Sequence, residues 1–205
     1  MKKVFLVLIL PCILTGFQAA YAQPKIGFGV KAGINISNQT TKVESPNVES
    51  IDLAGIIRFN AGAWFNYFIF DKLAVQPEIM ISGKGTDWND PNYNVKDLLT
   101  YIDVPVLLKF QPIDLLNIHA GPQFGYLLLA NQKDNETGDV IRISDYYKKS
   151  DLGLVVGLEV NLPFFINLDA RYVFGLITAS SDVMYIDPWI NNFFQISAGY
   201  RFMGK

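Results

Sequence analysis

The sequence predicts an all-β protein: a closed, eight-stranded antiparallel up-and-down transmembrane β-barrel. Half of the residues are hydrophobic, yet beyond the first 22 residues the apolar side chains alternate with polar ones instead of forming one long run. Eight segments show this alternation, and each has about 11 residues, which suits a tilted strand crossing the hydrocarbon core of a membrane. The connections between the segments alternate between short and long. These three observations together favour a membrane barrel.

The start of the chain is typical of a secretory signal peptide. Lysines at positions 2 and 3 precede an apolar stretch at 4–17, and Ala20 and Ala22 supply the small residues that precede a cleavage point. A transmembrane anchor is the alternative interpretation, but the run is short for a spanning helix. We therefore expect a signal peptide at 1–22 and one exported β-barrel domain at 23–205.

Cysteine content and charge exclude several classes of function. Cys12 is the only cysteine and falls in the expected signal peptide, so the mature chain has no disulfide, thiolate metal site or cysteine nucleophile. Removing Lys2 and Lys3 leaves 15 basic residues against 19 acidic ones, a net charge of −4. This balance gives no indication of a nucleic-acid partner.

Four alternating segments occupy the first half of the chain. Their apolar sets include Phe28, Val30 and Ile34 in 25–37; Ile57, Phe59 and Phe65 in 56–67; Val75, Ile79 and Ile81 in 73–84; and Ile102, Val104 and Leu108 in 98–110. No charged residue falls on these apolar sets. Each segment therefore predicts a strand with one apolar and one polar face.

The second half of the chain repeats the pattern. Its apolar sets include Ile118, Ala120 and Phe124 in 117–128; Leu154, Val156 and Leu158 in 151–162; Ile166, Leu168 and Tyr172 in 165–176; and Phe194, Ile196 and Tyr200 in 193–202. The last segment is expected to pair with 25–37, because an open sheet edge is not tolerated in hydrocarbon.

The lengths of the connections predict the topology. Short connections follow the second, fourth and sixth strands, whereas long ones follow the others, at 38–55, 86–97, 130–150 and 177–191. Outer-membrane barrels have short periplasmic turns and long extracellular loops. We expect both mature termini on the periplasmic side. The loop at 130–150 contains alternating residues that could extend its hairpin beyond the membrane, and this loop and 38–55 are the expected contact surfaces.

Glycine indicates which face looks inward. Ten glycines lie on the polar faces, among them Gly33, Gly62 and Gly157. Inside a narrow barrel they leave room for large side chains, whereas on the outside of a soluble barrel they would only weaken the strands. The polar faces are therefore expected to line the lumen, with a soluble periplasmic barrel as the alternative. Aromatic residues near strand ends could form interfacial girdles: Tyr67, Phe110, Tyr200 and Phe202 at one end, and Tyr101, Tyr126, Tyr172 and Phe174 at the other.

Six stretches of the chain resemble the PorT-like outer-membrane β-barrel family. They are GVKAGINIS at 29–37, AVQPEIMISGKG at 74–85, YIDVPVLLKF at 101–110, AGPQFGYLL at 120–128, DYYKKSDLGLVVGLEV at 145–160 and FFQISAGYRF at 193–202. The resemblance spans nearly the whole mature chain and implies a small, single-domain outer-membrane barrel. The founding member looks like an accessory of a protein secretion system, but most relatives have no assigned role, so the resemblance does not carry that role to this chain.

The polar faces predict a network of charges in the lumen. It comprises Lys31, Arg58, Glu78, Lys84, Asp103, Lys109, Asp151, Glu159, Asp169, Arg171 and Arg201. An eight-stranded barrel is only wide enough for side chains to fill it, so we interpret the set as a structural ion-pair network. A conducting path or proton path is the alternative.

Two further features invite a functional interpretation. His119, the only histidine, could act as a general base, but a lumenal histidine hydrogen-bonded to its neighbours is favoured. The loop at 86–94 holds Asp87, Asn89 and Asp90 without the regular calcium-loop motif, so ordinary turn chemistry is favoured over calcium. We expect no catalytic, cofactor or metal site.

Three prolines lie inside adjacent predicted strands, Pro77, Pro105 and Pro122. Proline cannot donate to a sheet ladder and is usually confined to edges or bulges, and a closed barrel has no edge. We therefore expect a band of β-bulges at one height.

These observations predict a small, non-enzymatic integral protein of the outer membrane of a Gram-negative-type cell. Its loops would serve surface interaction or envelope or secretion assembly. A narrow channel or ligand port is the alternative, and a lipid-modifying enzyme is the third hypothesis. The expected partners are outer-membrane lipid, lipopolysaccharide and an envelope or secretion-system protein, and the barrel is expected to be monomeric.

Overall fold

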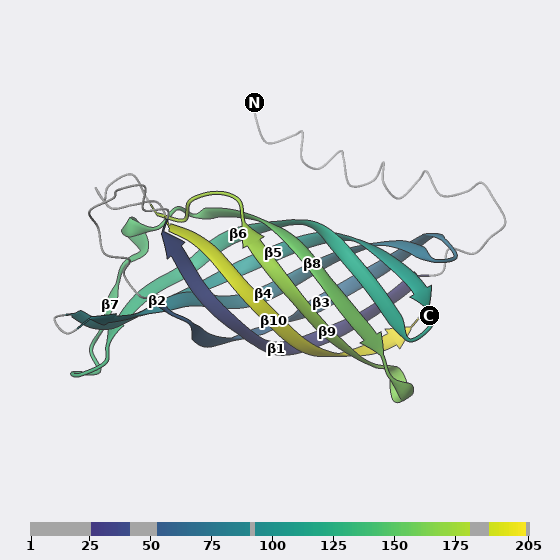
Figure 1. Ribbon diagram of the computed structural model, residues 1–205, viewed down its shortest axis with the longest axis horizontal. Coiled ribbons are helices and arrows are strands. Elements are labelled where there is room, and N and C mark those ends of the chain that lie inside the picture. Colours follow the sequence, from purple (N-terminus) through teal and green to yellow (C-terminus); the bar gives the residue numbers. More distant parts are fainter. Residues whose placement is uncertain (1–25, 42–52, 91–92, 181–188, 204–205) are drawn as a thin grey trace, which may run out of the picture.

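Eight long strands form a closed antiparallel ring in the computed structural model, which describes residues 26–41, 53–90, 93–180 and 189–203 (Figure 1). The predicted signal peptide at 1–22 lies outside the described residues. Among the described residues, no helix has the length and apolar character needed to cross a membrane. The predicted fold class, an all-β closed barrel of eight strands, is confirmed.

Each strand pairs with its neighbour along the chain, and the last pairs with the first. The ring consists of β1 (Ile26–Thr41), β3 (Ile56–Phe70), β4 (Leu73–Asp90), β5 (Tyr93–Ile113), β6 (Leu116–Asp134), β8 (Ser150–Asn161), β9 (Ile166–Gly175) and β10 (Trp189–Met203). β10 closes the ring on β1 in antiparallel register, with Gly33 opposite Ser197. The predicted closure of the last strand on the first is therefore correct.

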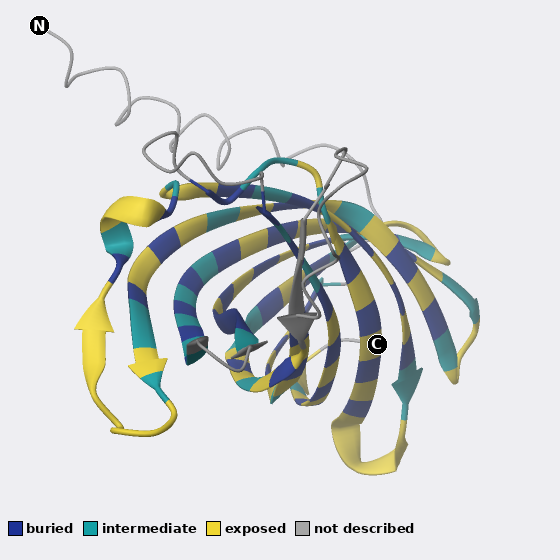
Figure 2. Cartoon of the chain, turned by 60° about the vertical axis from the view of Figure 1, so that its left-hand side comes forward, coloured by how far each residue is buried: buried dark blue, intermediate teal, exposed yellow. Residues whose placement is uncertain are grey.

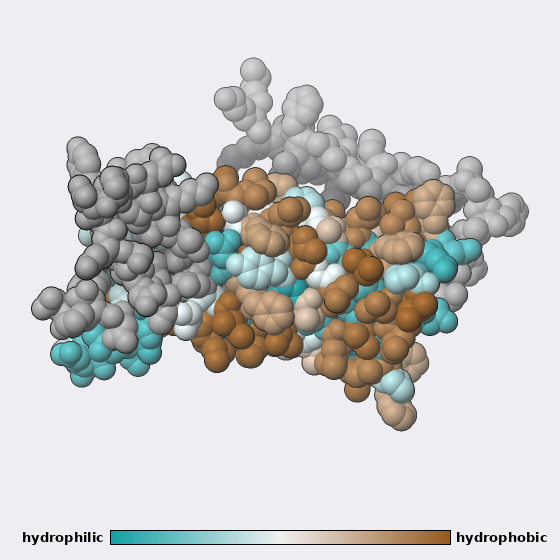
Figure 3. Space-filling view, in the orientation of Figure 1, coloured by the Kyte–Doolittle hydropathy of each residue, from teal (hydrophilic) through white to brown (hydrophobic). Residues whose placement is uncertain are grey.

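Burial alternates along most of the length of the ring strands, which confirms the predicted faces. Stripes of buried and exposed residues follow the strands in Figure 2. Exposed positions carry apolar residues such as Val30, Ile79 and Leu158, whereas the opposite positions are buried and mostly polar, apart from the inward apolar cluster of Leu107, Val155, Val173 and Phe193. On the visible face in Figure 3, a broad apolar zone covers the barrel wall and hydrophilic residues gather at the left-hand end. The apolar face therefore looks outward, as expected for a barrel surrounded by lipid.

The two ends of the barrel differ. At one end, here called the turn end, short connections join β3 to β4, β5 to β6, and β8 to β9, the last through the 3-10 turn η2 (Pro163–Phe165). At the other, the loop end, β4, β5 and β6 run on past the ring and are joined by the short strands β2 (Leu53–Ala54) and β7 (Val140–Arg142) (Figure 1). The 3-10 turn η1 (Ser144–Tyr146) follows β7.

Strand pairing at the loop end revises the predicted loops. The connection expected at 86–97 is an extension of the β4–β5 hairpin, in which Thr86 pairs with Asp97 and Asn89 with Asn94. The predicted extension of the 130–150 hairpin is confirmed, because Val140–Arg142 pairs with Asn131, Gln132 and Lys133 of β6. Most of the predicted loop at 38–55 lies outside the described residues.

The prediction of a band of bulges at the three prolines is wrong. Around Pro77 the register of β4 with β5 is unchanged, with Pro77 opposite Val106 and Met80 opposite Asp103. Pro105 lies opposite Gln123, and Pro122 opposite Leu154, again with no shift. Bridge pairs are missing beside the prolines, but no residue is inserted. A proline removes only its own N–H donor, so the ladder skips that position while the neighbouring bonds keep the register.

Bulges occur elsewhere, chiefly near strand ends. The extra residue is Phe202 of β10 opposite Phe28/Gly29, Ile69 of β3 between Phe68 and Phe70, and Leu128 of β6 opposite Thr100/Tyr101, and a fourth shift lies at Phe110/Ile113 in β5. At the third bulge the adjacent Leu128 and Leu129 of β6 are both exposed. This bulge marks the height at which the extension leaves the ring.

Candidate functional site

The lumen holds the predicted charged residues, and it is the candidate site. Nine of the eleven are buried, whereas Arg58 and Arg201 are partly buried. Every one of them is on the polar face of its strand. The structure therefore places the predicted set together inside the barrel, where each charge must find a partner or remain solvated.

Lys84 crosses the lumen on the loop-end side. Its Nζ lies 3.0 Å from Asp103 Oδ1 and 3.0 Å from Asp151 Oδ2. Asn191 donates to the same Asp151 oxygen at 3.2 Å. The ammonium also lies 4.3 Å from the ring centroid of Tyr101. One cation therefore links β4, β5 and β8 through bonds that fill the barrel at this height.

Glu78 is the centre of a second cluster, deeper in the barrel. Its carboxylate receives Lys31 Nζ at 2.7 Å, Gln76 Nε2 at 2.6 Å and Arg171 Nη1 at 2.9 Å. Arg171 Nε is also 3.7 Å from Asp169. All these side chains are buried. The cluster joins strands β1, β4 and β9, which are not neighbours in the ring, so it ties opposite walls together.

A third cluster lies toward the turn end. Lys109 Nζ contacts Glu159 Oε1 at 2.5 Å and Gln76 Oε1 at 3.1 Å, and Asn117 donates to Glu159 at 3.0 Å. Gln76 thus connects this cluster to that of Glu78. Most of the predicted charges therefore belong to one of two hydrogen-bonded groups, one around Lys84 and one that links Glu78 with Lys109, rather than to separate pairs, which supports the structural interpretation of the set.

Neutral polar side chains fill the part of the lumen beside the charged clusters. Asn35 Nδ2 donates to Ser82 at 2.8 Å, Asn60 Nδ2 donates to Asn35 at 2.9 Å, and Ser197 donates to Asn60 at 2.8 Å. These residues come from β1, β3, β4 and β10 and are buried. Together with the charged clusters they pack the lumen with side chains, as expected for eight strands.

His119 is buried in the lumen, but the predicted hydrogen bonds are absent. Neither ring nitrogen has a hydrogen-bond partner among the described residues, and the nearest acid is Asp169, 3.5 Å from Nε2. Asp169 likewise has no hydrogen bond to either carboxylate oxygen. The prediction of a hydrogen-bonded histidine is therefore wrong. In the described part of the chain, no hydroxyl side chain bonds His119, so the base–nucleophile arrangement that hydrolysis needs is not assembled there.

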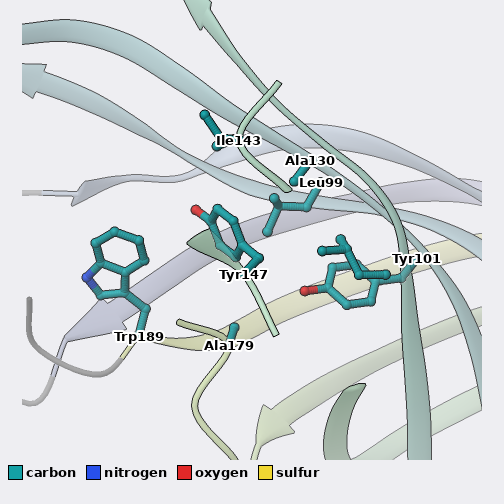
Figure 4. Packing of buried hydrophobic residues seen from close by; sticks show 8 residues of the cluster. Leu99, Tyr101, Ala130, Ile143, Tyr147, Ala179 and Trp189 are labelled. Carbon is teal, nitrogen blue, oxygen red and sulfur yellow. The ribbon is translucent and has the colours of Figure 1, made fainter. Parts of the chain in front are cut away.

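An apolar cap covers the lumen at the loop end, and sequence reasoning did not find it. Figure 4 shows its members, which come from β5, β6, β10, the residues flanking η1 and the segment after β9: Leu99, Tyr101, Leu127, Ala130, Ile143, Tyr147, Ala179 and Trp189. The rings of Trp88 and Tyr147 pack against Trp189 at centroid distances of 5.2 and 6.0 Å. Tyr101, expected in an outer aromatic girdle, is instead fully buried here.

One buried carboxylate holds the cap in place. Asp97 Oδ2 accepts Tyr147 Oη at 2.8 Å and Trp88 Nε1 at 3.0 Å, and Asp97 Oδ1 accepts Gln132 Nε2 at 2.9 Å. The sequence carries a signal for this part of β5. Val95, Asp97, Leu99 and Tyr101 are spaced two apart, and this spacing begins before the predicted start of the strand at 98.

The turn end of the lumen opens into a small polar pocket with about 230 Å³ of empty space, counting its mouth. Buried polar atoms without a hydrogen-bond partner in the described residues line it: Trp64 Nε1, Asn66 Oδ1, Asn167 Oδ1 and Arg201 Nε. Two are donors and two are acceptors, so this end of the lumen can bind water. The lumen is thus polar and open at one end and apolar and covered at the other.

Only part of the calcium site considered in the sequence analysis lies among the described side chains. Asp87 pairs with Lys96 at 3.1 Å and accepts Asn135 Nδ2 at 3.4 Å, whereas the side chains of Asn89 and Asp90 lie outside the described residues. Among the side chains that the structure describes, no three carboxylate or histidine groups gather as metal ligands.

Comparison with solved structures identifies the same architecture in other proteins. Ail, the attachment invasion locus protein of Yersinia pestis, matches in its complex with the heparin analogue sucrose octasulfate, with a TM-score of 0.52 and 16% identity over 87% of this chain and 99% of Ail. Neisserial surface protein A matches with a TM-score of 0.53 and 12% identity over 84% of this chain and 96% of its own. At these identities the likeness concerns the fold alone.

No curated protein matches the chain. The model of one protein family does, over residues 21–180, which is more than half of the chain. That match agrees with the closed ring of eight strands, the outward apolar face and the packed polar lumen. The chain belongs to the outer membrane protein beta-barrel domain family.

Proposed function

We propose that this protein is a plugged, non-enzymatic barrel of the outer membrane that presents its loop-end extension outside the cell for contacts with surface or envelope partners. The observation that carries the proposal is the closure of the lumen at the loop end. There the bridge from Lys84 to Asp103 and Asp151 lies near an apolar cap that includes Trp189.

The plug opposes conduction for an electrostatic reason. An ion passing Lys84 would have to separate a buried cation from two carboxylates, and breaking a buried pair costs about 3–5 kcal/mol. It would then meet Leu99, Leu127 and Trp189, whose apolar side chains offer no ligand to replace its water shell. Lys84 and the cap residues Leu99, Leu127 and Trp189 are held by strand backbone, which supports a permanent filling of the lumen rather than a gate.

The extension supplies the surface. Beyond the ring, β6, β7 and the turn between them carry exposed charged residues of both signs, including Lys133, Glu136, Asp139 and Arg142. The pairing of β6 with β7 holds Lys133 and Arg142 in fixed positions at low entropic cost, as binding surfaces require. Lipopolysaccharide, and an envelope or secretion-system protein of the kind that the PorT-like resemblance suggests, are the partners we propose for this surface.

A narrow channel or ligand port is the second candidate, and the turn-end pocket favours it. Trp64, Asn66, Asn167 and Arg201 offer unpaired polar atoms to anything that enters from that end. The plugged barrel requires a lumen that is blocked, whereas a channel requires a lumen that is open from one end to the other. A lipid-modifying enzyme has less support, because His119 has neither a hydrogen-bonded acid nor a hydroxyl nucleophile among the described residues.

Planar-bilayer recordings of the purified protein test the proposal. We expect no stable current steps from the wild-type protein. Stable ohmic steps would overturn the plugged barrel, and a change of ion selectivity in Lys84→Met would show that the current passes through the lumen. Lys96→Met is the matched control, since Lys96 pairs with Asp87 on the surface of the extension.

A further inference from the structure

The turns at the turn end expose large apolar side chains. Phe70, Ile113, Leu115 and Phe164 are all exposed, and Phe164, in the turn between β8 and β9, is 84% exposed. Turns that face water ordinarily carry polar residues, glycine or proline. An exposed apolar residue beside a polar one needs no explanation, as at Phe70 beside Asp71 and Ile113 beside Asp114, but the turn between β8 and β9 exposes apolar side chains with no polar one among them.

The backbone of the η2 turn holds its two phenylalanines in an unfavourable conformation. Phe164 and Phe165 both have φ of 63°, in the left-handed region that bulky residues avoid. Hydrogen bonds on either side fix the turn: Asn161 N donates to Leu115 O at 2.8 Å, and Leu162 N to Ile166 O at 2.8 Å. The fold therefore maintains a strained turn that displays an aromatic ring.

Phe165 continues a row of aromatic rings on the outer wall of the barrel. Its ring packs edge-on against Tyr200 at 6.4 Å, Tyr200 packs against Phe202 at 5.4 Å, and Phe202 against Phe28 at 5.6 Å. Tyr200, Phe202 and Phe28 belong to the exposed apolar face of β10 and β1. The turn is thus an extension of the lipid-facing surface.

The turn also projects sideways. In Figure 1 it is the coiled green ribbon at the lower right, and it stands out from the wall of the barrel rather than lying across the lumen. Residues 162–166 read Leu-Pro-Phe-Phe-Ile, with no charged or hydrogen-bonding side chain. A surface of this composition offers nothing to specify a protein partner, but it suits the boundary between lipid headgroups and acyl chains.

We propose that Phe164 and Phe165 form a membrane anchor that inserts into the lipid leaflet at the turn end. The partner is a phospholipid surface. The anchor fixes the depth of the barrel in the membrane, and the strain at the two phenylalanines is maintained because it directs the Phe164 ring into the leaflet.

Site-directed spin labelling tests the anchor directly. In a Cys12→Ser background, Phe164→Cys and Asp114→Cys are each labelled with a nitroxide and reconstituted in phosphatidylcholine vesicles. Asp114 is the matched control, because it lies in an exposed neighbouring turn at the same end. We expect the label at 164 to collide more often with oxygen than with a water-soluble nickel complex, and the label at 114 to show the reverse. Equal, nickel-accessible labels at both positions would overturn the proposal.

A second set of variants separates the ring from the strain. Phe164→Gly relieves the left-handed backbone and removes the ring, whereas Phe164→Trp keeps an aromatic ring. We expect Phe164→Gly to unfold at a lower urea concentration than Phe164→Trp in vesicles, despite its relaxed backbone. An equal or higher midpoint for Phe164→Gly would contradict the anchor. Protection of the 164 label in native envelopes but not in vesicles would replace the lipid surface with a protein partner.

Discussion

The hydroxyl of Tyr147 donates to Asp97 at 2.8 Å across 50 residues of sequence and fixes the segment after β7 to the inner face of β5. Trp88 donates to the same carboxylate oxygen. The apolar rings of Tyr147 and Trp88 are thereby held against Trp189 at the mouth of the barrel. A buried carboxylate thus positions the apolar cap.

Removing the Tyr147 hydroxyl should loosen the cap. Tyr147→Phe loses a hydrogen bond to a charged group, which costs about 1.5–3 kcal/mol, while Asp97 keeps its bonds from Trp88 and Gln132. We expect faster amide exchange at Ile143, whose N–H donates to Ala130 O in the same cap. Tyr146→Phe, at an exposed neighbour, is the control. Unchanged exchange in Tyr147→Phe would show that ring packing alone holds the segment.

Removing the cation from the Lys84 bridge should destabilise the whole barrel. Lys84→Met leaves Asp103 and Asp151 buried without a counter-charge, which costs about 3–5 kcal/mol. Urea unfolding in lipid vesicles measures the loss. Adding Asp103→Asn and Asp151→Asn should restore much of the stability, because it removes the uncompensated charges. Lys96→Met breaks an exposed pair and should change the unfolding free energy by about 0–1 kcal/mol.

A side chain at Gly33 should prevent closure of the ring. A Cβ at this position would overlap the Ile196 carbonyl oxygen and would lie 2.6 Å from Ser197 Cα, both on the paired strand β10. Gly33→Ala should therefore reduce the yield of heat-resistant folded barrel on gel electrophoresis. Gly55→Ala is the control, since its nearest contact would be an ordinary 3.5 Å. Equal folding of the two variants would refute this reason for glycine.

The tip of the β6–β7 hairpin should lose order in acid. Asp134 Oδ1 accepts the backbone N–H groups of Thr137 and Glu136, which holds the pKa of this exposed carboxyl below its usual value. Its contribution to stability is therefore present above the unfolded pKa of about 4 and is lost as the pH falls through the folded value. Measured against the intrinsic exchange rate at each pH, the protection of the Thr137 amide should fall below about pH 4. Asp134→Asn should abolish this pH dependence.

Strand number, strand faces and topology could all be predicted from the sequence, because they depend on local alternation. Lipid requires an uninterrupted apolar face, so residues such as Ile79 and Leu158 mark the outer wall without any knowledge of their neighbours. The polar residues left over identified the lumenal set for the same reason. Only Arg58 and Arg201, near the strand ends, are less enclosed than the other members.

Features that depend on pairing between distant strands could not be predicted. The prolines suggested bulges, but Pro77, Pro105 and Pro122 all keep their register, because neighbouring bonds compensate for one missing donor. Tyr101 was placed on the outer girdle, although its position in β5 turns it into the lumen. His119 was expected to form hydrogen bonds. Its distance from Asp169 depends on how far apart β6 and β9 lie across the lumen, and the sequence does not record that distance.

The sequence by itself determined that this chain forms a closed barrel with an apolar exterior and a charged interior, since alternation with a period of two is a property of each strand alone. Tertiary structure decided which charges meet, as Lys84 meets Asp103 and Asp151, and that Tyr147 and Trp189 cover one end of the lumen. The physical reason is that shear and stagger bring residues of non-adjacent strands to the same height, and no local pattern records that relationship.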